Sequence, residues 1–296
     1  MKTFTLNNGL KLPAIGIGTY KASLEAITQA IEAGFRYFDT ASFYGNENLI
    51  AEAISRSGLP RKEFIIASKL WKTDMGIDKV NSAFEKTLEN LNTDYVDIFF
   101  IHWPQKGLNV ETWQALEEIY SHGKIKALGL SNFLPYHAED IMKSGKAYSS
   151  ATQEGVKVSP FHAQESIMNT CKVMPSIAQL EFHAGHTQAF ALNYYRERNI
   201  LLQAWSPLAR GRVFNDELIL ELAGKYNVKP AQICLAFCLA ENVMPIPRAS
   251  SSSERLQEYI DSEKITLSHE DIMRLENMPP LGWSGEHPDR ARVKIV

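Results

Sequence analysis

Four side chains with acid–base chemistry stand at the ends of short segments or just beyond them. Asp39, Lys69 and His102 each end a run of mostly apolar residues, and Tyr44 lies in the loop just after Asp39. If the runs are neighbouring parallel strands, a carboxyl, a phenol, an amine and an imidazole meet at one rim of the sheet. These groups together predict a proton-donating site for carbonyl chemistry.

The chemistry expected of these groups follows from their ordinary proton affinities. Reduction of a carbonyl group needs a hydride on carbon and a proton on oxygen, and Tyr44 is the natural proton donor. A free phenol has a pKa near ~10, and a neighbouring ammonium such as that of Lys69 is expected to lower it. Asp39 would pair with Lys69 and keep it protonated, and His102 would donate a hydrogen bond that orients and polarises the carbonyl oxygen.

The elements that must position these residues alternate between strand and helix patterns. Residues Thr3 to Leu12 alternate around Asn7-Asn8-Gly9, which predicts a β-hairpin before the main fold. Helical spacing follows in two apolar stripes, Val80-Phe84-Leu88-Leu91 and Val110-Trp113-Leu116-Tyr120. Strands are expected at Ala14–Thr19, Phe35–Thr40, Phe64–Leu70, Tyr95–His102, Ile125–Ser131, Ile177–Phe182, Ile200–Ser206 and Val243–Pro247. Eight strand–helix units without a long linker predict an α/β fold, a closed (β/α)8 TIM barrel with an N-terminal hairpin, formed by one domain over residues 1–296.

One connection breaks the regular alternation. About thirty residues separate the helix that ends near Lys143 from the strand near Ile177, against the ~2–6 usual for such links. This insertion, residues 145–176, should lie at the rim opposite the active site. We expect either a plain surface insertion on a monomer or a surface for self-association.

Composition and charge limit the partners. A net charge of −3 gives no sign of a nucleic-acid-binding surface. No apolar run approaches the ~20 residues that cross a membrane, and no secretory signal is evident, so we expect a cytoplasmic enzyme. Gly16-Ile17-Gly18 is followed three residues later by Lys21, so the dinucleotide fingerprint G-x-G-x-x-G is not satisfied. His183 and His186 have metal-ligand spacing, but no third ligand accompanies them in an informative pattern, and we expect no metal.

Several ordered motifs add a resemblance to a known family. They include Phe38-Asp39-Thr40-Ala41, Tyr44-Gly45-Asn46-Glu47, Ser68-Lys69-Leu70-Trp71, Ile101-His102-Trp103-Pro104, Leu130-Ser131-Asn132-Phe133, Gln179-Leu180-Glu181-Phe182-His183, Trp205-Ser206-Pro207-Leu208 and Ile246-Pro247-Arg248. In these motifs nearly the whole chain resembles the aldo-keto reductase superfamily, in particular the bacterial-type 2,5-diketo-D-gluconate and methylglyoxal reductases. The resemblance implies a TIM barrel, an extended NADPH (NADP+) cofactor and a catalytic tetrad of Asp39, Tyr44, Lys69 and His102.

The resemblance also implies the residues that bind the cofactor. Ser131, Asn132 and Gln179 would contact the nicotinamide carboxamide, and Trp205 would stack on the ring. The remaining cofactor contacts would be Ser206 and Leu208 along the pyrophosphate, Arg248 and Arg255 on the adenosine 2′-phosphate, Glu258 near the adenine, and Gly18, Thr19, Tyr20 and Asp39 at the first strands. Arginine suits a phosphate because its donors form a planar fork.

This chain departs from the family pattern at several cofactor positions. Arg248 stands for the usual Lys, Ala249 for the usual Ser and Tyr259 for a common Asn, and the run Ser250–Ser253 is one residue longer. His183-Ala184 replaces a usual His-Pro. None of these touches the tetrad, and we expect NADPH to be preferred over NADH.

Aromatic residues near the tetrad predict the substrate pocket. Trp71 and Trp103 follow Lys69 and His102 at the starts of loops, so we expect them to wall the pocket together with Tyr20 and His102, with Trp283 from the tail closing it. The expected substrate is a small carbonyl compound, and these walls favour an apolar or aromatic one.

Two other functions fit the same residues. A regulatory subunit with the same fold would keep the cofactor and use the insertion to bind a partner, although the intact tetrad argues against loss of catalysis. A Schiff-base lyase would use Lys69 as a nucleophile. Asp39 and Tyr44 argue instead for a protonated Lys69.

Overall fold

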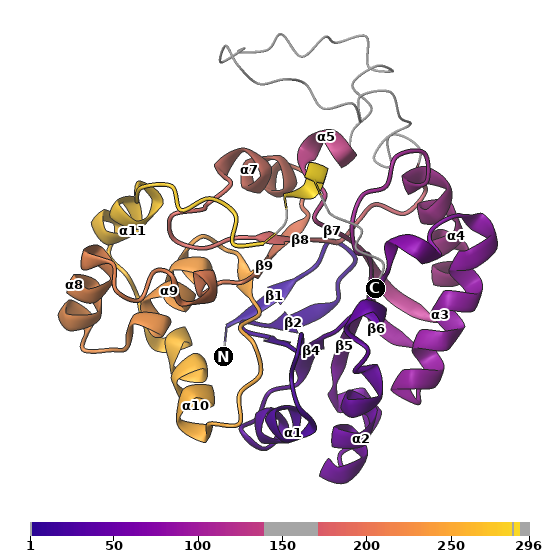
Figure 1. Ribbon diagram of the computed structural model, residues 1–296, viewed down its shortest axis with the longest axis horizontal. Coiled ribbons are helices and arrows are strands. Elements are labelled where there is room, and N and C mark those ends of the chain that lie inside the picture. Colours follow the sequence, from indigo (N-terminus) through magenta and orange to yellow (C-terminus); the bar gives the residue numbers. More distant parts are fainter. Residues whose placement is uncertain (1, 139–170, 286, 291–296) are drawn as a thin grey trace, which may run out of the picture.

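The N-terminal hairpin closes one end of the molecule. The structure, a computed structural model, describes residues 2–138, 171–285 and 287–290. Strands β1 (Thr3–Thr5) and β2 (Lys11–Pro13) pair antiparallel, which confirms the predicted hairpin. The side-chain amides of Asn7 and Asn8 donate to the carbonyl oxygens of Pro175, at 2.9 Å, and Lys126, at 2.8 Å. Both acceptors lie where barrel strands begin, so the hairpin covers the amino-terminal end of the barrel (Figure 1).

Eight parallel strands form the barrel in the order of the sequence. They are β3 (Ile17–Gly18), β4 (Tyr37–Asp39), β5 (Ile65–Leu70), β6 (Val96–Ile101), β7 (Ile125–Ser131), β8 (Ile177–Glu181), β9 (Leu201–Trp205) and β10 (Met244–Pro245). The amides of Gly16 and Gly18 donate to Pro245 O at 3.1 Å and Pro247 O at 2.9 Å, and these bonds join the last strand to the first. Each strand falls inside the range predicted for it, and the (β/α)8 barrel is confirmed.

Helices pack around the outside of the strands (Figure 1). The helices within residues 2–138 are α1 (Leu24–Glu32), α2 (Glu47–Ser57), α3 (Ile77–Leu91), α4 (Asn109–Ser121) and α5 (Pro135–Ala138). Those after residue 171 are α7 (Ala189–Glu197), α8 (Glu217–Tyr226), α9 (Pro230–Ala240), α10 (Ser253–Asp261) and α11 (His269–Glu276). The stripe predicted on α3 is buried, and on α4 Trp113 and Leu116 are buried while Val110 and Tyr120 are partly so. The helices therefore cover the sheet with the faces that the sequence predicts. No helix in the described ranges is both long and apolar enough to cross a membrane.

Most of the predicted insertion of residues 145–176, namely residues 145–170, lies outside the described residues. Its last residues return to the barrel against α4. The Glu117 carboxylate accepts the amides of Lys172 and Val173 at 2.6 and 2.8 Å, and the Trp113 indole donates to Val173 O at 3.2 Å. This contact fixes where β8 begins, and self-association through the insertion stays a prediction.

A buried carboxylate joins three strands near the covered end of the barrel. Asp97, 2% exposed, accepts hydrogen bonds from Arg61 at 2.9 Å, from Lys126 at 2.7 Å and from the Ile66 amide at 3.0 Å. Its ion pair with Arg61, whose side chain is 19% exposed, is better shielded from water than its ion pair with Lys126, whose side chain is 44% exposed. The carboxylate therefore links β5, β6 and β7.

Replacement of this carboxylate should weaken the fold. Asp97→Ala removes the acceptor of the Ile66 amide and the carboxylate partner of the Arg61 and Lys126 cations, so we expect a loss of about 2–4 kcal/mol in the free energy of unfolding. Urea titration followed by circular dichroism measures the loss. Glu89→Ala, which removes an exposed pair with Lys86, is the control and should leave the midpoint almost unchanged. Equal midpoints for the two variants would contradict the stabilising role of Asp97.

Candidate active site

The four acid–base residues come together at the carboxyl ends of β4, β5 and β6, as predicted. Asp39 is the last residue of β4, Lys69 is the penultimate residue of β5, and His102 directly follows β6. Tyr44 ends a short 3-10 helix, Ser42–Tyr44, that Gly45 terminates in a left-handed conformation. Parallel neighbours in a barrel end at the same rim, and this topology places the four side chains in one site.

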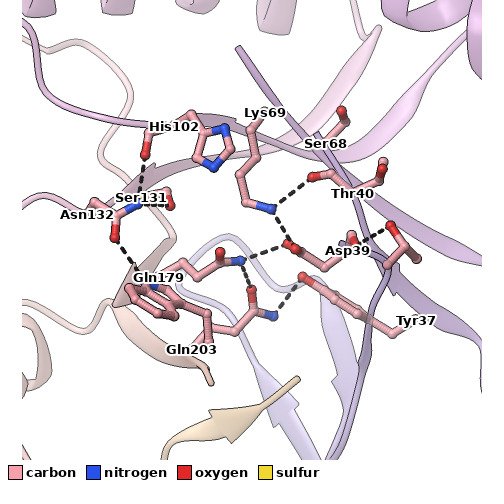
Figure 2. A network of polar contacts seen from close by, with 12 residues as sticks. Tyr37, Asp39, Thr40, Ser68, Lys69, His102, Ser131, Asn132, Gln179 and Gln203 are labelled. Carbon is pink, nitrogen blue, oxygen red and sulfur yellow. Dashed lines mark hydrogen bonds and ion pairs between the residues drawn. The ribbon is translucent and has the colours of Figure 1, made fainter. Parts of the chain in front are cut away.

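Asp39 and Lys69 form a buried ion pair. Lys69 Nζ lies 2.5 Å from Asp39 Oδ1 and also donates to Thr40 O at 2.8 Å (Figure 2). Asp39 is 2% exposed and Lys69 is fully buried. Burial raises the pKa of Asp39 and lowers the pKa of Lys69, and the attraction between the two charges opposes both shifts. The predicted pairing of Asp39 with Lys69 is therefore present.

Tyr44 packs between this pair and His102. Lys69 Nζ lies 5.1 Å from the centre of the Tyr44 ring, and the Tyr44 and His102 ring centroids are 5.7 Å apart at 76°. Tyr44 is half-buried, so a small molecule can reach it. The phenol, the imidazole and the ion pair thus border the same space.

The expected lowering of the Tyr44 pKa by Lys69 is wrong. Burial, followed by repulsion from the Asp39 carboxylate, raises the pKa of Tyr44 well above its usual value of 10.0. The physical reason is that Asp39 largely compensates the Lys69 charge at 2.5 Å, so little of that charge acts on the phenol. Tyr44 is consequently a protonated, neutral phenol at neutral pH.

His102 is a neutral imidazole in the site. Burial, and then the positive charges of Lys69 and Lys72, lower its pKa well below the usual 6.5. Its Nδ1 atom is buried and has no hydrogen-bond partner among the described residues. A neutral imidazole carries one N–H, which is enough to donate a hydrogen bond to a substrate oxygen.

Aromatic side chains surround the open side of Tyr44 and His102. Tyr20 lies 4.9 Å from the Tyr44 ring, and Trp71 and Trp103 lie 5.1 and 6.4 Å from the His102 ring. Phe43, which the sequence analysis did not single out, stacks on Trp71 at 3.9 Å and is half exposed. The wall is therefore more aromatic than predicted.

Lys72 is a second residue that the sequence analysis did not single out. Its ammonium is buried and lies 5.2 Å from the rings of both Trp71 and Trp103. Neither Lys72 nor Phe43 carried a signal in the sequence, because both lie in single 3-10 turns after a strand end, which are too short to show a periodicity.

The residues expected to contact the nicotinamide hold one another. Asn132 Nδ2 donates to His102 O at 3.0 Å and to Ser131 Oγ at 3.2 Å, while Trp205 Nε1 donates to Asn132 Oδ1 at 2.9 Å. Gln179 Nε2 donates to Asp39 Oδ2 at 2.7 Å (Figure 2). The two amides and Trp205 thus line the same end of the barrel as the tetrad.

Thr19, which directly follows β3, holds the backbone carbonyl of Asp39. The amide and the hydroxyl of Thr19 both donate to Asp39 O at 2.9 Å. Gly18 forms an isolated parallel bridge with Arg248, and a side chain at Gly18 would lie 3.2 Å from Ile246 O. The small residue is required there because the first and last strands approach closely.

The loop after β9, expected along the pyrophosphate, has an unusual backbone. Ser206, Ala209 and Arg210 have positive φ angles of 50°, 49° and 55°. Such conformations cost free energy in residues other than glycine and are found mostly at functional sites. Leu208 lies within this turn, where its carbonyl accepts the Gly211 amide at 2.7 Å.

Arg248 and Arg255 are brought together at the amino-terminal end of α10. Both are exposed, and the charges of both lower the pKa of Tyr259, against burial, which raises it. Neither guanidinium forms an ion pair with a carboxylate in the described part of the chain. Glu258 follows on the same helix and is partly exposed. Two exposed arginines at a helix amino terminus suit a phosphate group.

Trp283 lies in a tail segment held against β8. Its ring packs on His186 and His287 at 4.6 and 5.1 Å, and the Ser284 amide donates to the buried Glu181 carboxylate. The expected role of Trp283 in closing the pocket stays a prediction.

His183 bonds to Ala184 O and to Glu181, and His186 packs on Trp283. No group of three or more His, Cys, Asp or Glu side chains within the described ranges is arranged to hold a metal ion.

Comparisons with known proteins show the family of the chain. The Aldo/keto reductase family matches residues 14–278. The glyoxal reductase of Bacillus subtilis is 34% identical over 97% of this chain and 96% of its own, and the 9,11-endoperoxide prostaglandin H2 reductase of Trypanosoma cruzi is 32% identical over 96% and 94%. A crystal structure of an aldo-keto reductase from a Medee basin deep-sea metagenome superposes with a TM-score of 0.80 at 32% identity, covering 93% of this chain and 94% of that one. The chain belongs to the aldo/keto reductase family, and it is an oxidoreductase.

The protonation state of His102 can be tested directly. NMR titration of the His102 imidazole should show a neutral ring from about pH 6 to pH 8. Because its pKa is lowered in the fold, His102 destabilises the protein only as the pH falls below the ordinary value of about 6.5. Lys72→Met should raise the pKa of His102, although burial still keeps it below that ordinary value. Lys79→Met, which removes a more distant ammonium, should leave the titration unmoved, and a wild-type midpoint near pH 7 would contradict the assignment.

Proposed function

We propose that this oxidoreductase reduces aldehydes and ketones to alcohols with NADPH, and that Tyr44 donates the proton. The observation that carries the proposal is the Tyr44 phenol, which is protonated and half-buried between the neutral imidazole of His102 and the Asp39–Lys69 pair. A donor has to carry its proton at the working pH and be reachable by the substrate. Tyr44 satisfies both conditions.

The residues of the site divide the work in the reduction. Bound NADPH supplies a hydride to the carbonyl carbon. The imidazole N–H of His102 holds the carbonyl oxygen next to Tyr44, and the Tyr44 hydroxyl transfers its proton to that oxygen as negative charge develops. Lys69 lies 5.1 Å from the Tyr44 ring and offsets part of the repulsion between the Asp39 carboxylate and the phenolate that remains, and Asp39 keeps the ammonium in place.

The chain offers groups that fit NADPH at two separate places. Gln179, Asn132 and Ser131 provide amide and hydroxyl groups beside the tetrad, where a carboxamide can exchange hydrogen bonds. Arg248 and Arg255 provide uncompensated positive charge at the start of α10, where the 2′-phosphate distinguishes NADPH from NADH.

The surroundings of Tyr44 favour a small substrate with an apolar or aromatic part. Phe43 stacked on Trp71 offers a flat face next to His102. The B. subtilis relative is named for glyoxal, so dicarbonyls belong in the substrate panel together with aromatic aldehydes. We also keep the prediction of a cytoplasmic monomer.

The contacts of Lys69 argue against a Schiff-base lyase. A nucleophilic lysine needs a free neutral amine, whereas Lys69 is fully buried and directs hydrogens to both Asp39 and Thr40. No observation in the described residues favours a regulatory subunit, since the insertion expected to carry that role lies largely outside them.

Removal of the Tyr44 hydroxyl tests the proposal. Tyr44→Phe should lower kcat for aldehyde reduction by about 100-fold or more, because a positioned general acid contributes 10²–10⁴-fold, and NADPH should bind as before. The assay follows loss of NADPH absorbance with methylglyoxal and a nitrobenzaldehyde. Tyr120→Phe on α4 is the control and should retain full activity. Equal rates for wild type and Tyr44→Phe would show that Tyr44 is not the proton donor.

The preference for NADPH over NADH tests the proposed contact of Arg248 and Arg255 with the 2′-phosphate. Arg255→Ala should weaken NADPH binding by roughly 10- to 100-fold, since a charge-assisted contact to a phosphate is worth about 1.5–3 kcal/mol, and NADH binding should change little. Calorimetric titration with both cofactors measures the two dissociation constants. An equal loss for NADPH and NADH would place Arg255 away from the 2′-phosphate.

A further inference from the structure

Four buried polar side chains, of which Asp39 is one, form a series of hydrogen bonds across the barrel. Tyr37 and Asp39 point inward from β4, two residues apart and therefore on the same face. Gln179 on β8 and Gln203 on β9 are direct partners in the strand register. Figure 2 shows that these two pairs face each other and that hydrogen bonds join Asp39 to Gln179, Gln179 to Gln203 and Gln203 to Tyr37.

The acceptors available to each amide determine its orientation. Gln203 Nε2 donates to the Tyr37 hydroxyl oxygen at 2.8 Å and lies 3.5 Å from the Met244 sulfur. Gln203 therefore turns its oxygen toward Gln179, whose Nε2 donates to that oxygen at 2.6 Å and to Asp39 Oδ2 at 2.7 Å. An amide nitrogen has two hydrogens, so both hydrogens of Gln179 are used.

The second acceptor of the Gln179 amide, Gln203 Oε1, restricts the orientation of that amide. With Asp39 alone, the Gln179 amide could rotate about a single N–H···O axis. Gln203 supplies the second point and thereby fixes the plane of the amide. The hydrogen bonds of the Gln179 side chain with the described residues are made by its nitrogen, so its oxygen keeps its capacity to accept a hydrogen bond from a ligand.

The surroundings leave these groups little freedom. Tyr37 and Gln203 are fully buried, and Gln179 is 2% exposed. Gly16 makes room for the Tyr37 ring, because a Cβ atom there would collide with Tyr37 Cδ1. Burial, and then the Asp39 charge, raise the pKa of Tyr37 well above 10.0, so the phenol stays neutral.

We propose that Tyr37 and Gln203 are positioning residues that lock the Gln179 amide, so that its nitrogen holds Asp39 and its oxygen receives the carboxamide N–H of the nicotinamide. The proposal rests on the proposed function, since it assumes that the cofactor's nicotinamide lies beside Gln179. It adds two residues that touch neither cofactor nor substrate and act through Gln179.

A cofactor analogue isolates this interaction. In reduced 3-acetylpyridine adenine dinucleotide phosphate a methyl group replaces the carboxamide NH2, so the analogue cannot donate to Gln179. Wild type should bind NADPH about tenfold more tightly than the analogue, the value of one hydrogen bond. In Gln203→Leu and Tyr37→Phe the ratio should fall to about threefold or less, because the amide plane is no longer fixed. Fluorescence titration measures all the dissociation constants.

Two further variants separate positioning from general damage. Gln203→Glu, when protonated, keeps an oxygen for Gln179 and a donor for Tyr37, so it should restore the wild-type ratio. Tyr226→Phe removes a phenol hydroxyl that bonds to Asp271 outside the barrel, and it should also keep the wild-type ratio. An unchanged ratio in both Gln203→Leu and Tyr37→Phe, with thermal melting showing folded proteins, would overturn the proposal.

A measurement on the cofactor-free protein distinguishes failure of this proposal from failure of the proposed function. The side-chain NH2 of Gln179, followed by NMR, should exchange with water at least about tenfold faster in Gln203→Leu than in wild type, because one N–H loses its partner. Unchanged exchange would show that Gln203 does not hold Gln179. If wild type bound no NADPH, the proposed function and the carboxamide contact would both fail, whereas tight NADPH binding without discrimination against the analogue would overturn this proposal alone.

Discussion

The active site depends on one buried ion pair, Asp39 with Lys69. Removing two charges from water costs several kcal/mol for each ion, and the cost is offset only where further hydrogen bonds satisfy the remaining positions. Here Thr40 O accepts from Lys69, and Gln179 donates to Asp39. The contacts come from β4, β5 and β8, so they exist only when the barrel is closed and in register. A slip of one residue would turn the Lys69 side chain away from the barrel interior.

The pairing also explains the state of Tyr44. If the Lys69 ammonium, 5.1 Å from the Tyr44 ring, had no partner, it would favour the phenolate. Because the Asp39 carboxylate lies 2.5 Å from this ammonium, the opposite charges of the pair largely cancel in their effect on Tyr44. Burial then controls the proton affinity of the phenol and keeps it protonated. In the direction of reduction this is the useful state, because an acid has to hold its proton until negative charge develops on the substrate oxygen. After the transfer, the Lys69 charge offsets part of the repulsion between the Asp39 carboxylate and the phenolate.

The fold and the tetrad could be predicted from the sequence because both depend on local patterns. Apolar runs marked every strand, and acid–base residues at strand ends marked the rim. The pKa of Tyr44 could not be predicted, since it depends on the distance and burial of a pair formed by two strands. Gln203 and Tyr37 looked like ordinary strand residues, because contacts across a barrel depend on its stagger and on side-chain reach. Phe43 lies in a loop, where its stacking on Trp71 follows from tertiary structure alone.

Rigid and adaptable parts of the site occupy different levels of the barrel. Below the rim, Tyr37 and Gln203 are fully buried, and the amide nitrogens of Gln203 and Gln179 are hydrogen-bonded, so Asp39 is held by groups that have little room to relax. At the rim, Tyr20 and Phe43 are about half exposed. The loop after β9 carries positive φ angles at Ser206 and Arg210 that burial of apolar side chains does not explain. Electrostatic stabilisation requires preorganised groups, whereas binding of a cofactor and varied substrates requires surfaces that adjust. Buried polar contacts in the lower barrel and partly exposed aromatic rings at the rim together meet both requirements.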